Sequence, residues 1–124
     1  MSDLRAALRK LDWRRTEPVP LPGFDVELYA RNLSEDEHAR HVEAWMLAED
    51  GKPDPAKRPL YRCRLIQVCL CERNGVPVYS DNGEFTDAGL QEIKQLPSEL
   101  TRPAGDFILK LNGIGGEQSD HSGN

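Results

Sequence analysis

The first apolar pattern along the chain is a leucine stripe near its N-terminus. Leu4, Leu8 and Leu11 recur at the spacing of one helical face, with basic residues between them. This spacing predicts a short amphipathic helix, which would be marginally stable by itself. Three prolines within residues 18–22 then predict an extended linker, because each proline disfavours helix in the residue before it. We therefore expect residues 1–18 to form a basic amphipathic arm and linker.

The next apolar pattern changes from period two to a helical period. Apolar and polar side chains alternate from Phe24 to Leu33, which predicts one half-buried strand. Residues 34–37 then form a capping box, so a helix of about four turns should begin at Glu35. One face of this helix carries the apolar residues Ala39, Val42, Trp45 and Met46.

The most apolar segment of the chain allows two interpretations. Pro59 suits the first turn of a helix, and the apolar residues from Tyr61 onward then predict a central, deeply buried helix. Asn74-Gly75 would stop that helix, but the same pair is also the strongest hairpin signal. A hairpin would pair Leu65–Cys71 with Val76–Ser80. The helix is favoured, and the hairpin stays open as the alternative.

Two further helices are expected toward the C-terminus. Thr86, flanked by a hydrophobic staple, should open a helix that ends before Pro97. A last apolar stripe from Leu100 to Leu111 is interrupted by a proline and a glycine and is closed by residues 112–113. The Gly-, Ser- and acid-rich residues 114–124 lack apolar anchors, and we expect a disordered tail there.

Together these elements predict a mainly α fold with a small β element, which is the α+β class. A chain of 124 residues suits a single compact domain, which we place at residues 19–113 with four to five helices and one or two short strands. No apolar run approaches the roughly 20 residues of a membrane-spanning helix, and no secretory signal is visible. The three cysteines are clustered and odd in number, so we expect reduced thiols and a cytoplasmic location.

Charge is distributed unevenly along the chain. Residues 1–16 hold five basic and two acidic residues, a net charge of +3, and the other 11 basic and 19 acidic residues leave −8 for the remainder. Such an acidic body would repel phosphate backbones, so nucleic-acid binding is unlikely and could depend only on the arm. A small regulator or inhibitor that uses this arm on nucleic acid is the alternative function.

The chemically reactive residues form no convincing catalytic or metal-binding pattern. His38 and His41 could share a helical face, but two histidines without another ligand cluster do not make a metal site. The cysteines Cys63, Cys69 and Cys71 lack zinc-finger spacing and suggest buried, inert thiols. We therefore expect a protein that is not an enzyme and that needs no cofactor or metal.

Three stretches, in order and at the right spacing, resemble the phage tail assembly chaperone family. Residues 19–37 resemble its proline-rich lead, strand, Arg-x-Leu-Ser/Thr turn and acidic helix start. Residues 64–81 are similar to its Arg-Leu apolar helix and the turn after it, and residues 107–113 to its closing Leu-Asn-Gly. The chain departs from the family at residues 102–105, where Arg-Pro and a glycine interrupt the final helix, which should therefore begin later.

The resemblance implies a tail assembly chaperone of a long-tailed phage or prophage. Members bind the tape measure protein, keep its apolar helices soluble, help recruit tail tube subunits and leave before the tail is finished. They also self-associate, and in many members a frameshift near the gene's end adds a C-terminal extension. As contact residues for the partner we expect Leu4, Leu8, Leu11, Trp45 and Met46, because exposed Trp and Met suit binding surfaces. For Trp45 and Met46, packing in the core is the favoured reading.

Overall fold

The computed structural model describes residues 2–114, and it confirms the α+β class. The helices are α1 (Ser2–Arg9), α2 (Glu35–His38), the π-helical η1 (Ala39–Glu43), the 3-10 turn η2 (Arg58–Leu60), α3 (Tyr61–Cys69), α4 (Asp87–Lys94) and α5 (Ser98–Leu111). The strands β1 (Thr16–Pro18), β2 (Tyr29–Arg31) and β3 (Leu70–Cys71) form one small antiparallel sheet in that order. Residues 115–124, where we predicted a disordered tail, lie outside the described part of the chain.

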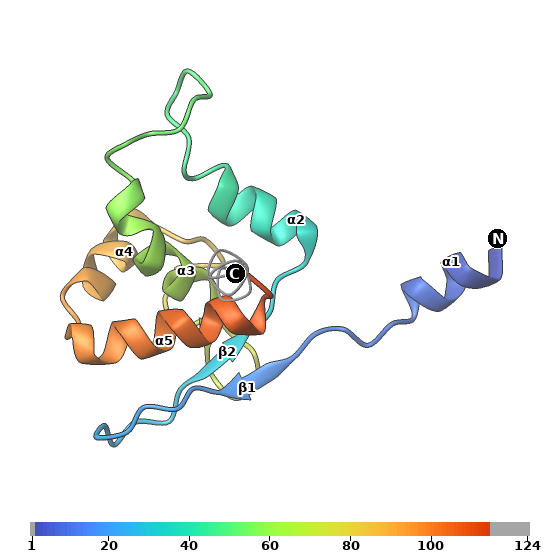
Figure 1. Ribbon diagram of the computed structural model, residues 1–124, viewed down its shortest axis with the longest axis horizontal. Helices are drawn as coiled ribbons and strands as arrows, with labels where there is room; N and C mark the ends of the chain where they lie inside the picture. Colours follow the sequence, from blue (N-terminus) through green and yellow to red (C-terminus); the bar gives the residue numbers. More distant parts are fainter. Residues whose placement is uncertain (1, 115–124) are drawn as a thin grey trace, which may run out of the picture.

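Helix α3 is the centre of the fold, as the apolar pattern predicted. It packs against α5, α4 and η1, and it leads directly into β3 of the sheet (Figure 1). The fully buried side chains from these elements include Val42, Leu65, Ile66, Val68, Leu70, Ile93 and Ile108. Removal of this apolar surface from water is the main source of the body's stability.

The segment that we expected to be a linker contributes a strand instead. Thr16–Pro18 forms β1, with Thr16 opposite Arg31 and Pro18 opposite Tyr29 in β2. Proline is compatible with this position because β1 is the edge strand of the sheet, and an edge strand can lack one donor. The body therefore begins at least two residues before the predicted boundary at residue 19.

The predicted strand over Phe24–Leu33 is much shorter in the structure. Only Tyr29–Arg31 is β2, and Val26, expected on the buried face, is 53% exposed. The ladder with β1 continues for one further bond, from the N–H of Val19 to the carbonyl of Leu28. The next residues on that side include two prolines, which have no N–H to donate, so the pairing cannot extend.

The helix from Glu35 forms, but its second half is wider than an α-helix. The capping box is complete: Ser34 Oγ accepts from the N–H of Glu37, and the Glu37 carboxylate accepts from the N–H of Ser34. In η1 the N–H of Ala44 then bonds to the carbonyl of Ala39, five residues earlier. This inserted residue changes the direction in which the following side chains point.

The central segment is a helix, and a hairpin much shorter than the predicted alternative follows it. Residues up to Cys69 are helical, which confirms the favoured reading. A tight hairpin follows, in which the N–H of Val78 bonds to the carbonyl of Leu70 and the N–H of Glu72 to the carbonyl of Val76. Gly75 occupies the turn with a φ of 88°. The hairpin thus pairs β3 with residues 76–78 and leaves residues 65–69 in the helix.

The last two helices begin at or before their predicted positions. Thr86 caps α4 by accepting from the N–H of Gly89, as predicted. Helix α5, however, begins at Ser98 and continues through Pro103, so the expectation of a later start is wrong. Its buried face, which the pattern did detect, outweighs the one backbone bond that a proline removes.

The end of α5 follows the predicted stop. Gly113 has a φ of 69°, and its N–H bonds to the carbonyl of Lys110. The N–H of Ile114 bonds to the carbonyl of Leu109 at 2.7 Å. These two bonds form a Schellman motif, which requires a left-handed residue at the position of the glycine.

Candidate partner-binding surfaces

The leucine face predicted as a contact surface is uncovered in the structure. Helix α1 projects from the body and packs on no other helix or strand (Figure 1). Leu4 and Leu8 in α1 are 67% and 60% exposed, and Leu11, two residues after the end of α1, is 58% exposed. Trp13 at the root of the arm is 39% exposed. An uncovered apolar helix face of this kind is typical of a surface that binds a partner.

The charges of the arm are divided between two roles. Asp3 lies in the first turn of α1 and Arg9 in the last, which favours the helix dipole. Arg14 and Arg15, by contrast, bond to the body. The projecting residues 2–12 therefore keep three basic and two acidic residues, a net charge of only +1, so the arm offers little to a phosphate backbone.

An ion pair fixes the root of the arm to the body. Arg14 Nη2 donates to both carboxylate oxygens of Glu37, at 2.9 and 2.8 Å, and Arg31 Nη1 lies 3.6 Å from the same group. Burial alone would raise the pKa of Glu37, but the bonds from Arg14 and the Ser34 N–H, with the two arginine charges, outweigh it. The net result is a pKa below the usual value of a glutamate.

Amide side chains complete this anchor. Asn32 Oδ1 accepts from the N–H of Arg15 at 2.7 Å, and its Nδ2 donates to the carbonyl of Trp13 at 2.9 Å. Arg15 Nη2 reaches the carbonyl of Leu111 at 2.8 Å. Asn112 in turn accepts from the N–H of Leu33 at 2.7 Å. The arm therefore leaves the body from a rigid point where β1, the start of α2 and the end of α5 meet.

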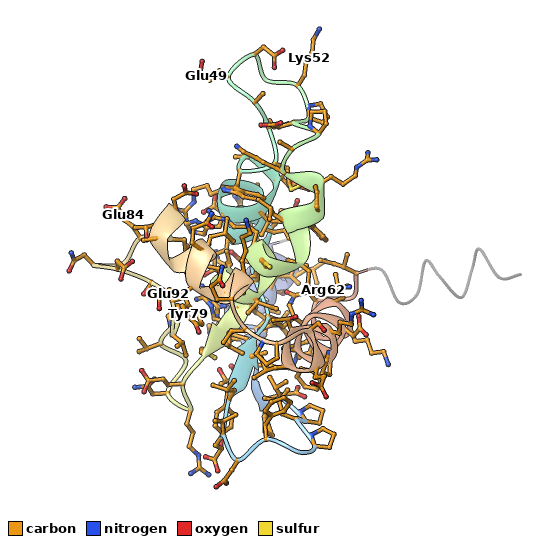
Figure 2. All side chains as sticks on the ribbon, turned by 90° about the vertical axis from the view of Figure 1, so that its left-hand side faces the viewer. Glu49, Lys52, Arg62, Tyr79, Glu84 and Glu92 are labelled. Atoms are coloured by element: carbon orange, nitrogen blue, oxygen red, sulfur yellow. The ribbon has the colours of Figure 1, made fainter. Side chains whose placement is uncertain are left out.

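The other predicted contact residues, Trp45 and Met46, lie half-buried after η1. Lys57 Nζ lies 5.3 Å from the centre of the Trp45 ring, within cation–π range. Beyond them the chain extends as a projecting loop, whose tip carries Glu49 and Lys52 (Figure 2). The structure therefore separates the five predicted residues into two surfaces, with the leucines on the arm and Trp45 and Met46 at the base of this loop.

A residue that the sequence analysis did not select lies beneath Trp45. The Arg64 guanidinium carbon is 5.2 Å from the centre of the Trp45 ring and 5.8 Å from that of Phe85. Arg64 is only 7% exposed, although it carries a charge. Its Nη1 donates to Gln67 Oε1 at 2.9 Å, and Gln67 Nε2 donates to the carbonyl of Thr86 at 2.7 Å. The signal in the sequence was an arginine and a glutamine three residues apart inside an apolar helix.

His41 and Cys69 are packed against other groups of the body. The His41 ring meets the Phe85 ring edge-on at 5.0 Å, and burial, helped by the charges of Arg40 and Arg64, lowers the pKa of His41. Burial raises the pKa of Cys69 to about 12. Within residues 2–114 no three His, Cys, Asp or Glu side chains are grouped so that they could hold a metal ion.

Comparisons with known proteins give no family for the chain. No family model, curated protein or solved structure matches it. Among the helices of residues 2–114, none is both long enough and apolar enough to cross a bilayer. The likeness to tail assembly chaperones therefore rests only on the three stretches of sequence described above.

Proposed function

We propose that this protein is a tail assembly chaperone of a long-tailed phage or prophage. It acts in the host cytoplasm, binds the tape measure protein and helps to recruit tail tube subunits. It self-associates along the tape measure and is absent from the finished tail. The proposal requires no catalytic group and no cofactor.

The uncovered leucine face of α1 is the observation that supports this role most directly. Leu4, Leu8 and Leu11 point away from a body of net negative charge. A long helical protein with an exposed apolar stripe would otherwise aggregate, and a leucine face that covers part of this stripe lowers that tendency. The acidic body then keeps the complex in solution, because net charge opposes association between complexes.

Co-expression with the tape measure protein of the same gene neighbourhood tests the proposal. The wild-type chain should keep the tape measure protein soluble and co-purify with it. A variant with Leu4, Leu8 and Leu11 changed to serine should lose most of this co-purification, because it removes the apolar contact and leaves the body intact. As a matched control, Val26→Ser changes one exposed apolar residue on the body and should leave the complex unchanged.

The proposal fails if the tape measure protein precipitates with the wild-type chain across a range of salt concentrations. Binding that weakens steeply with salt and that depends on Arg5, Arg9 and Lys10 would instead support the nucleic-acid alternative. The bonds of Arg14 and Arg15 to the body argue against this alternative, since they leave the arm with a net charge of only +1.

A further inference from the structure

Arg64 is a buried cation held in one orientation. Its Nε donates to the carbonyl of His41 at 2.7 Å. Its Nη1 donates to Gln67 Oε1 at 2.9 Å and, at 3.4 Å, to the carbonyl of Phe85. Gln67 is fully buried and is itself fixed by the carbonyl of Thr86. These bonds determine both the position and the plane of the guanidinium group.

The charge of Arg64 has no carboxylate partner among residues 2–114. Within residues 2–114, no Asp or Glu oxygen lies within 4 Å of the guanidinium. Nη2 makes no hydrogen bond to any group of these residues. Burial lowers the pKa of Arg64, and the charge of Asp87 acts against this only from a distance. Nη2 is not among the fully buried polar atoms that lack a partner, so it keeps contact with solvent and a partner's carboxylate can approach it there.

The surroundings of Arg64 suit a carboxylate on an apolar segment. Trp45 and Phe85 both lie within cation–π range of the guanidinium and are half-buried, so each ring keeps some surface for a partner. Nε and Nη1 are engaged by the body, so Nη2 is the nitrogen that can donate a charge-assisted bond to a carboxylate oxygen of a partner.

We propose that Arg64, with Trp45 and Phe85 beside it, binds the carboxylate of an acidic side chain on an apolar helical segment of a partner protein. The inference rests on the proposed function in one respect: the tape measure protein is the partner that supplies this segment. The leucine face of the arm then covers a different part of the same partner. The acidic residue sets where the partner's helix sits on the body, and the leucines add affinity.

Two synthetic helical peptides test this inference without the tape measure protein. Both carry a leucine stripe, and they differ only in one central residue, which is Glu in the first and Gln in the second. The Arg64 Nε–H is hydrogen-bonded, so its exchange with water is slowed and its NMR signal can be followed. The Glu peptide should shift this signal and the Trp45 indole signal, and should bind roughly tenfold more tightly than the Gln peptide.

Protein variants identify the group responsible. Arg64→Lys keeps a charge, but its shorter side chain does not reach the position of Nη2, so the variant should lose most of the preference for the Glu peptide. Arg73→Lys, the same change at an exposed position, should retain the preference for Glu. If the wild-type chain binds the two peptides equally, the inference is overturned, while co-purification of the tape measure protein through the leucine face would still support the proposed function.

The chain's own acidic residues beyond Ile114 are the rival occupant. In the full-length protein, Glu117→Gln with Asp120→Asn should leave the Arg64 Nε signal unchanged in the absence of peptide. A shift of this signal would assign the carboxylate to the same chain and would overturn the inference.

Discussion

At Gly105 the absence of a side chain allows two helices to approach each other. A Cβ atom at this position would lie 2.7 Å from Cγ of Arg62 in α3 and 3.0 Å from its Cδ. Both distances are shorter than normal contacts between such atoms. Arg62 lies on the side of α3 that faces α5 (Figure 2). A glycine that seemed to weaken the last helix is therefore a condition for its packing.

Gly105→Ala should lower the free energy of unfolding by about 1 kcal/mol, the middle of a net range of about 0–2 kcal/mol. The methyl group must displace the Arg62 stem, and overpacking of this kind costs about 1–3 kcal/mol, whereas the helix gains up to about 1 kcal/mol from alanine. Urea unfolding would measure the difference.

The same substitution in an Arg62→Ala background separates these two effects. There the contact is gone, and Gly105→Ala should be neutral or stabilising because only the gain in helix propensity remains. An equal loss of stability in both backgrounds would contradict this account of the packing.

The residue scale also shows why Arg64 could not be selected from the sequence. Arg64 and Gln67 lie in an apolar run of the sequence. Their side chains are oriented by hydrogen bonds to the carbonyls of His41, Phe85 and Thr86, which are distant in sequence. Periodicity assigns such residues only to a face of the helix. By contrast, Leu4, Leu8 and Leu11 could be chosen from the sequence because their spacing alone defines their face.

At the scale of elements, helix caps were predicted correctly from the sequence, whereas the pairing of strands was not. The capping box at Ser34 and the N-cap at Thr86 involve residues three apart, and both form as predicted. Strand β1 and the short β2 depend on which residues lie opposite each other across the sheet. A pattern of alternating residues does not contain that information, so the predicted strand was too long and its partner was not recognised.

Glu37 links two elements, and its charge can be tested separately from its cap. Glu37→Gln keeps a side chain that can complete the capping box but removes the ion pair with Arg14. At pH 7 the variant should be less stable than the wild type, by about 0.5–1.5 kcal/mol.

The difference should depend on pH with a defined sign. Because the pKa of Glu37 is lowered in the folded protein, its carboxylate stabilises the fold fully above the unfolded value of 4.5. That contribution is lost as the pH falls through the folded pKa. Unfolding in urea should therefore show a smaller gap between variant and wild type at pH 3 than at pH 7. Glu35→Gln, in the same first turn but exposed, should show a smaller gap.

At the scale of the whole molecule, the chain divides into a body and an arm. The leucine stripe and the prolines differ clearly from the core pattern, and they were the signals for a separate arm in the sequence. The sequence could not show that Arg14 and Arg15 belong to the body, since their partners Glu37 and Leu111 are far away in sequence. Two of the five basic residues counted in the arm, Arg14 and Arg15, thus bond to the body and hold the arm in place.

Two truncations test this boundary. A chain that begins at Asp12 loses α1 and should unfold at the same urea concentration as the full chain, because the removed residues make only local hydrogen bonds. A chain that begins at Thr16 also loses the Arg14 and Arg15 contacts and should be less stable by roughly 2 kcal/mol or more. If the two truncated chains lose the same amount of stability, α1 contributes to the stability of the body.

The anchor brings the two ends of the body together. Arg15, where the arm leaves, bonds to the carbonyl of Leu111, three residues before the last described residue, Ile114. A segment joined after Ile114 therefore starts beside the root of the arm. If both segments bind one partner, contact by the first holds the second at a high effective concentration, of millimolar order for a short flexible connection. Two weak contacts can then give one high affinity, and displacement of either segment lowers the affinity to that of the remaining contact.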